Sequence, residues 1–167
     1  MSSVLYLGVE GVVFPRRTRP QVARDSSASR RPPTNSELLD ELSAIAEAAS
    51  NLQVVLNGSY VVDIGYRRIL SLLPHGLASR TVGATTSGNR LHRKNDLRKR
   101  ADVLRADVGR RNPHTLTIVD ASRSAIPIEY LCRSVLVACN NSAALRQTLD
   151  QIQRLLLPDH TDLPPET

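Results

Sequence analysis

The sequence contains few aromatic residues and few cysteines. It has no Trp, one Phe and four Tyr, and only two cysteines, Cys132 and Cys139. Aromatic platforms on which single-stranded nucleic acids stack are therefore scarce. The residues around the cysteines show no metal-ligand spacing, so we predict two buried free thiols in place of a zinc site or a disulfide framework.

Long apolar runs are missing as well. No window approaches the length of a membrane span, and the N-terminus lacks a basic region, a long apolar region and a cleavage site. We therefore expect a cytoplasmic protein. The 167 residues, 41% of them apolar, are enough for one α/β domain with its own core.

Two segments carry the positive charge of the chain. Residues 16–31 contain six Arg and one Asp, a local charge of +5, and residues 90–111 contain nine Lys or Arg and three Asp, a local charge of +6. Because the whole chain carries +6, the remainder carries −5. This concentration favours a local anionic partner, a phosphate-bearing small molecule or a nucleic acid. The alternative is that the Arg clusters only keep the protein soluble.

The first apolar run leads into a turn that contains two glycines. Val4 to Leu7 has the pattern of a buried strand in a parallel sheet, and Gly8-Val9-Glu10-Gly11-Val12 follows it. Gly11 permits backbone angles closed to other residues, so the chain can leave the sheet there. Since ligands of open α/β sheets bind at the carboxyl ends of the strands, we expect positions 8 and 10 to face a site.

The rest of the chain alternates between predicted helices and strands. Further strands are predicted over 52–56, 116–119 and 135–138, and helices over 35–50, over a stretch ending before Pro74, from Asn95 to Val108 and from Asn141 or Ser142 to Leu156. Thr34 and Glu37 have the spacing of a capping box. Residues 1–157 are predicted to form the domain, with an Arg/Pro/Ser-rich flexible insertion loop at 16–34 and a disordered acidic, Pro-rich tail at 158–167.

Small polar residues follow two of the later strands. Asn57, Gly58 and Ser59 come after 52–56, and a backbone amide with small polar side chains is enough to cradle a phosphate. Asn57-Gly58 can also be a simple turn before a helix. Asp120 follows 116–119, where a lone Asp can serve only to cap the next turn.

These motifs resemble those of the haloacid dehalogenase (HAD) superfamily of phosphotransferases, and are most similar to the small capless HAD domains of RNA-repair proteins. The resemblance covers about residues 3–157. It implies a three-layer, Rossmann-like α/β domain with a central parallel sheet and no folded cap. The first family motif, a strand followed by Asp-x-Asp-Gly-Val, stands here as Gly8-Val9-Glu10-Gly11-Val12.

The resemblance also assigns roles to single positions. Gly8 replaces the nucleophilic aspartate and Glu10 the acid/base aspartate, while Ser59 keeps the phosphate-binding hydroxyl of the second motif. The third motif is a Lys or Arg that steadies the phosphate; Arg100 matches it best by position, with Arg93 and Lys94 as rivals. Asp120 keeps one acid of the fourth motif. A basic helix face that is simply solvated is the alternative for Arg100.

The missing carboxylate at position 8 decides the functional prediction. Phosphoryl transfer of the HAD kind forms an aspartyl phosphate, which glycine cannot form. Glu10 and Asp120 are left as vestigial metal ligands, too few for a firm Mg²⁺ site, so no cofactor is expected unless a residual Mg²⁺ site functions. We expect a pseudophosphatase that binds a phosphate-bearing molecule, a nucleotide or an RNA end. The alternatives are a Mg²⁺-dependent phosphohydrolase using Glu10 or Asp120 in altered roles, and an electrostatic nucleic-acid-binding protein.

Overall fold

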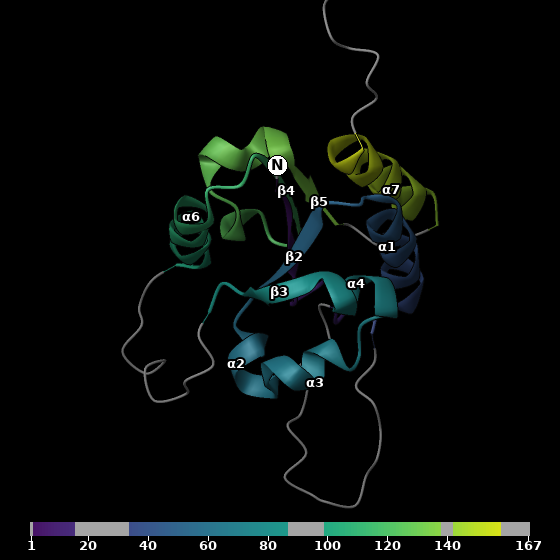
Figure 1. Cartoon of the computed structure of the whole chain (residues 1–167), viewed down its shortest axis with the longest axis horizontal. Helices are drawn as coiled ribbons and strands as arrows, with labels where there is room; N and C mark the ends of the chain where they lie inside the picture. Colours follow the sequence, from purple (N-terminus) through teal and green to yellow (C-terminus); the bar gives the residue numbers. More distant parts are fainter. Residues whose placement is uncertain (1, 16–33, 87–98, 138–141, 158–167) are drawn as a thin grey trace, which may run out of the picture.

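The computed structural model describes residues 2–15, 34–86, 99–137 and 142–157 (Figure 1). The predicted insertion loop, apart from Thr34, and the predicted tail lie outside these ranges. The prediction that no folded cap follows the first strand falls on the same segment. The predicted helix start at Asn95 also lies outside them.

Five parallel strands form one sheet in the order β3-β2-β1-β4-β5 (Figure 1). The strands are β1 (Ser3–Gly8), β2 (Leu52–Asn57), β3 (Thr81–Ala84), β4 (Thr115–Asp120) and β5 (Ser134–Leu136). The predicted α/β fold with a central parallel sheet is therefore confirmed. Only β3 was not predicted, because this edge strand is short, contains Gly83 and leaves Val82 49% exposed.

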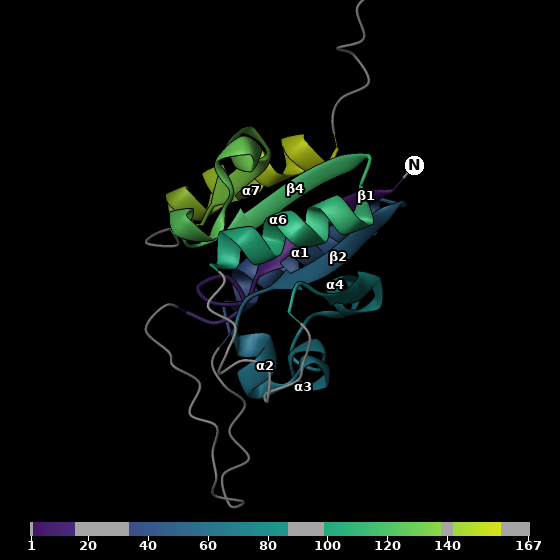
Figure 2. The ribbon, with the colours of Figure 1, turned by 90° about the vertical axis from the view of Figure 1, so that its left-hand side faces the viewer.

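Helices cover both faces of the sheet and make three layers. α1 (Ser36–Ala48), α4 (His75–Arg80) and α7 (Ser142–Leu156) lie on one face, and α6 (Arg100–Arg111) lies on the other (Figures 1 and 2). The short helices η1 (Arg123–Ala125) and η2 (Ile128–Arg133) follow β4. None of the helices in the described ranges has the length and apolar character needed to cross a bilayer.

Strand β1 contributes to the core on both faces. Its side chains alternate, so that Leu5 and Leu7 join the larger core while Val4 and Tyr6 join the core beneath α6. All four are buried, which explains why this strand is a continuous apolar run.

The core beneath α6 contains one buried polar cluster. The Tyr6 hydroxyl donates to Asp107 Oδ2 at 3.0 Å, and Asp107 also accepts from Arg110 and from Arg111, the latter at 2.7 Å. Burial, and after it the Asp107 carboxylate, raises the pKa of Tyr6 above its ordinary value, so the phenol stays protonated as the donor. Two arginines of the basic segment 90–111 are thus ion-paired within the domain.

The predicted helix before Pro74 is broken. It consists of α2 (Tyr60–Ile64) and α3 (Tyr66–Leu70), separated by Gly65 with a φ of 98°. That φ lies in the left-handed region, which glycine enters without a steric penalty. The apolar periodicity did not reveal the break, because Ile64 and Ile69 pack on the same core from both pieces.

The prediction of a buried thiol at Cys132 is wrong. Cys132 is an exposed free cysteine on η2, a helix with no buried residue. Its apolar neighbours on η2 are exposed or only partly buried as well. The hydrophobic residues of this segment were therefore misleading as a sign of burial. Cys139 lies outside the described residues.

Candidate functional site

The site lies where β1, β2 and β4 end. Gly8 pairs with Asn57 in the parallel register of β1 and β2, and Asp120 ends β4 on the other side of β1. These are the carboxyl ends of neighbouring parallel strands, where open α/β sheets bind ligands. The structure thus brings together the first, second and fourth sequence motifs, each of which was predicted to follow a strand.

The turn after β1 is held by Asn35. Gly11 has a φ of 87° and its amide donates to the Phe14 carbonyl at 2.7 Å, which closes the turn. The Asn35 side-chain amide donates to the carbonyls of Val12 at 2.7 Å and Gly11 at 3.3 Å. The predicted capping box is wrong, because Asn35 is the N-cap of α1 and no side chain caps this end.

Position 8 offers no space for a side chain. A Cβ at Gly8 would lie 2.7 Å from Asp120 Oδ2 and 3.1 Å from the Asp120 Cα. Both separations are shorter than the ordinary contact distance of 3.4–4 Å, and the one to Oδ2 is too short unless an atom shifts. The buried Asp120 carboxylate therefore occupies the volume into which a nucleophilic side chain from β1 would begin to extend.

Asp120 is buried but fully hydrogen-bonded. Its Oδ2 accepts from Arg100 Nη2 at 2.8 Å and from Asn57 Nδ2 at 3.3 Å, and its Oδ1 accepts from the Ser122 amide at 2.8 Å. Burial raises the pKa of this carboxyl above its ordinary value, while the Arg100 guanidinium and the Ser122 hydrogen bond oppose that rise. Asp120 does make the local contact expected of a turn cap, but its other oxygen faces the site.

Glu10 reaches across to the segment that follows β2. Its Oε1 accepts from the Ser59 hydroxyl at 2.6 Å and from the Tyr60 amide at 2.9 Å. Its Oε2 lies over Gly58, where a Cβ would come within 1.9 Å of it. Ser59 and Tyr60 therefore hold the carboxylate of Glu10, and Gly58 leaves the space that it occupies.

Arg100 is the cation of the site. It is the first residue of α6, its side chain is 29% exposed, and Nη2 lies 2.8 Å from Asp120 Oδ2 and 3.5 Å from Glu10 Oε2. Arg100 therefore lies between two carboxylates and is not part of a simply solvated helix face. Its rivals Arg93 and Lys94 lie outside the described residues.

Two threonines of the site were missed from the sequence. Thr85 donates its hydroxyl to Asn57 Oδ1 at 3.1 Å, and Thr86 donates to the Gly58 carbonyl at 3.2 Å. They follow β3, so they reach the same edge of the sheet as Asn57. Because β3 was not predicted as a strand, the rule that places strand ends at the site was not applied to them.

The family comparison agrees with this geometry. A model of the HAD domain in Swiss Army Knife RNA repair proteins matches residues 4–148. The chain belongs to this HAD family. Neither the search of curated proteins nor the search of solved structures finds a match. The five-stranded parallel sheet with its helices is consistent with a HAD domain.

HAD domains generally use Mg²⁺, but the residues of this HAD site do not fit it. Glu10 Oε1 and both oxygens of Asp120 accept hydrogen bonds, and Arg100 lies within 4 Å of both carboxylates. The Arg100 guanidinium already brings one positive charge to these two carboxylates. The described residues contain no group of three or more His, Cys, Asp or Glu positioned to hold a metal ion.

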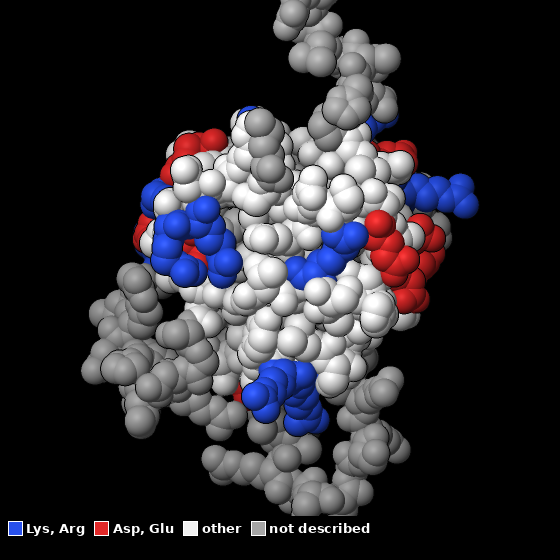
Figure 3. Space-filling view, viewed as in Figure 1, with Lys and Arg blue, Asp and Glu red and all other residues white. Residues whose placement is uncertain are grey.

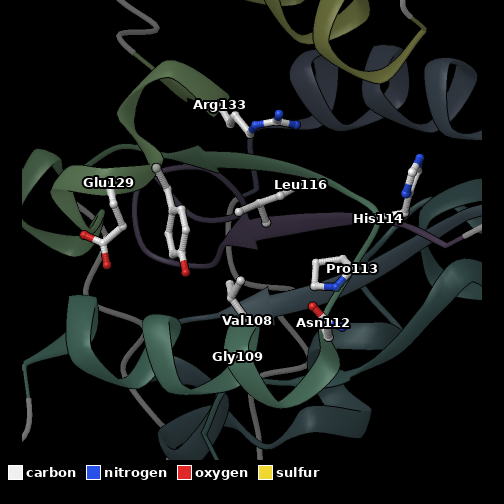
Figure 4. Close-up of a pocket in the computed structure, with 9 residues that line it drawn as sticks. Val108, Gly109, Asn112, Pro113, His114, Leu116, Glu129 and Arg133 are labelled. Carbon is white, nitrogen blue, oxygen red and sulfur yellow. The ribbon is translucent and has the colours of Figure 1, made fainter.

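A separate cavity lies near the amino end of β4, away from the carboxyl ends that form the site. It has a volume of about 360 Å³ and is lined by residues from the end of α6, the start of β4 and η2, including Val108, Leu116 and Arg133 (Figure 4). Leu116 is the second residue of β4 and Asp120 the last, a separation of about 13 Å along an extended strand. The cavity is therefore not part of the HAD site.

The described basic residues do not form one continuous surface on the face shown in Figure 3, where blue atoms gather in separate groups over α6 and around α2 and α3. On α6, Arg105 pairs with Asp102 and Glu129, while Arg110 and Arg111 pair with Asp107. The arginines in this part of segment 90–111 therefore form ion pairs within the domain. The other basic segment, 16–31, lies outside the described residues.

Proposed function

We propose that this HAD domain does not catalyse phosphoryl transfer and serves as a binding or regulatory module for a phosphate-bearing ligand. The observation that carries the proposal is at position 8, where there is no carboxylate and where Asp120 takes the space that one would need. An aspartyl phosphate requires a carboxylate nucleophile, and neither a glycine nor a carboxylate already tied to Arg100 provides it.

The donors that remain support phosphate recognition. The Ser59 hydroxyl, the Tyr60 amide and the Arg100 guanidinium converge on one carboxylate, so their geometry suits an anionic group of that size. Among phosphate-bearing molecules, we favour a nucleotide or the terminal phosphate of an RNA, because the family takes its description from RNA repair proteins.

The first test is a phosphate-release assay over nucleotides and p-nitrophenyl phosphate with Mg²⁺. We expect no turnover above a protein-free blank. Turnover that Glu10→Ala abolishes would establish the alternative, a metal-dependent phosphohydrolase with Glu10 in an altered role, and would overturn the proposal.

The second test compares short RNAs that end in a phosphate or a hydroxyl. Fluorescence anisotropy should show tighter binding of the phosphorylated RNA, and Ser59→Ala should remove that preference. The control is Arg68→Ala, an exposed change on α3 that should weaken both RNAs equally. Equal binding of the two RNAs by the unaltered protein, with a steep salt dependence, would instead identify an electrostatic nucleic-acid binder.

A further inference from the structure

The carboxylate of Glu10 occupies the same donors that a phosphate would need. Its Oε1 takes both the Ser59 hydroxyl and the Tyr60 amide, at 2.6 and 2.9 Å. Its Oε2 lies 3.5 Å from Arg100 Nη2. It also fills the space in which a side chain at position 58 would begin. Glu10 thus accepts the hydrogen bonds of Ser59 and Tyr60 and forms an ion pair with Arg100, whose hydrogen bond goes to Asp120.

We infer that Glu10 is a built-in competitor, an intramolecular anion that closes the phosphate site until a ligand displaces it. The inference rests on the proposed function, because it concerns the same site. A carboxylate and a phosphate both present several oxygens on one central atom, so they can use the same hydroxyl, amide and guanidinium donors. A phosphate therefore binds only when the Glu10 side chain turns away.

Two polar atoms of the described residues at the site lack a hydrogen bond when Glu10 occupies it. Glu10 Oε2 and Arg100 Nε are buried and have no hydrogen-bond partner among the described residues. Unpaired buried polar atoms are unfavourable, so the closed arrangement is incompletely satisfied. A phosphate has more acceptor oxygens than a carboxylate and can accept from Arg100 as well as from Ser59 and Tyr60.

Gly58 is the second residue on which this arrangement depends. Any larger residue would place its Cβ 1.9 Å from Glu10 Oε2, so the carboxylate could not lie where it does. An Asp at position 10 is one methylene shorter than Glu10. The longer side chain and the glycine opposite it together let the carboxylate reach the Ser59 and Tyr60 donors.

The test measures the affinity for inorganic phosphate by calorimetry. Glu10→Ala should bind phosphate at least about tenfold more tightly than the unaltered protein, because two hydrogen bonds and one like charge no longer oppose the ligand. Adding Ser59→Ala to Glu10→Ala should remove this gain. The charge-matched control is Glu41→Ala, an exposed change on α1, which should leave phosphate affinity unchanged.

A second variant keeps the test decisive if Glu10→Ala does not fold. Glu10→Gln preserves the shape and one acceptor oxygen but removes the charge, and it should show a smaller gain in phosphate affinity in the same direction. If both folded variants bind phosphate no better than the unaltered protein, Glu10 is not a competitor.

The two proposals fail in different ways. One outcome is that the unaltered protein binds phosphorylated RNA through Ser59 while Glu10→Ala shows no increase in affinity for inorganic phosphate. In that case the inference is wrong and the proposed function stands. If Glu10→Ala gains phosphate binding while the unaltered protein hydrolyses phosphate esters, the competitor stands and the proposed function is wrong.

Discussion

Glycines of this chain differ in what a side chain would meet. A Cβ at Gly8 would lie 2.7 Å from an Asp120 oxygen, whereas a Cβ at Gly109, within α6, would have nothing within 4 Å. Gly8 is therefore fixed by a contact across the sheet, while Gly109 has no such contact. A comparison of the two positions separates the close approach from the general effect of removing a glycine.

We expect Gly8→Ala to lower the free energy of unfolding by about 1–3 kcal/mol, since the new methyl group overpacks against Asp120. Gly109→Ala should raise it by about 0.5–1 kcal/mol, because alanine is favoured over glycine inside a helix. Urea denaturation of both variants measures the difference. A Gly8→Ala protein as stable as the unaltered one would show that Asp120 moves aside easily and that position 8 can accept a side chain.

Arg100 and Asp120 together predict a pH dependence. Burial raises the pKa of Asp120, so between the ordinary and the raised pKa the folded state holds a proton that the unfolded state has released. Stability from this group therefore increases as the pH falls through that window and is lost as the pH rises. Removing Arg100 takes away a cation that opposes the rise, so the pKa of Asp120 should increase further.

Arg100→Gln should accordingly destabilise the fold by about 2–3 kcal/mol at neutral pH, by leaving a buried carboxylate without its cation. This loss of stability should become smaller in acid, where Asp120 is protonated in the folded state. Urea denaturation from pH 4 to 8 tests this, with Arg105→Gln as the control, because the ion pairs of Arg105 are exposed and should matter little. A deficit independent of pH would mean that Arg100 acts through packing and not through charge.

At the scale of elements, one residue connects the turn after β1 to the start of α1. Asn35 is the N-cap of α1, yet its side chain donates to the carbonyls of Gly11 and Val12. The turn that carries Glu10 is also tied to α2, since the rings of Phe14 and Tyr60 are 6.3 Å apart. The position of Glu10 thus depends on contacts made outside its own segment.

Asn35→Asp separates the two roles of this residue. Asp is as good an N-cap as Asn, so a capping role predicts no loss of stability. Asp cannot donate to the two carbonyls, so we expect a loss of about 1–3 kcal/mol and faster amide hydrogen exchange over residues 9–14. Thr34→Ala is the control, because the structure gives Thr34 no capping contact. Unchanged exchange in Asn35→Asp would assign the stability of the turn to the backbone alone.

At the scale of the whole molecule, a HAD fold is retained while the charged groups of the site form ion pairs with one another. Each carboxylate of the site is paired with Arg100, and the described arginines of α6 are paired with carboxylates of the domain. The molecule therefore has little need of a divalent cation for its stability.

We expect millimolar Mg²⁺ to leave the thermal midpoint of the protein unchanged relative to the same protein in EDTA. A ligand that binds only the folded state raises the midpoint once its concentration exceeds its Kd, and the site offers Mg²⁺ no free pair of carboxylate oxygens. Differential scanning fluorimetry is sufficient for this comparison. A Mg²⁺-dependent rise that Asp120→Asn removes would show a metal site in spite of Arg100.

The sequence by itself determined the class of fold, the central strand, and several of the positions that lie at the carboxyl ends of the strands. Gly8, Asn57, Ser59 and Asp120 could be placed together because carboxyl ends of parallel strands share one edge of a sheet. It did not reveal β3 or the exposure of Cys132, because a short edge strand and a partly exposed helix carry weak apolar periodicity. It did not reveal the break at Gly65, because the apolar positions continue across it.

Only the tertiary structure decided what the site residues do to one another. Glu10 and Ser59 are 49 residues apart in sequence, and Asn57 and Asp120 are 63 apart. Contacts over such separations depend on the register of β1, β2 and β4 and on the rotamer that each side chain takes, neither of which local propensity specifies. That Glu10 holds the Ser59 hydroxyl, and that Arg100 holds Asp120, could therefore be read only from the folded chain.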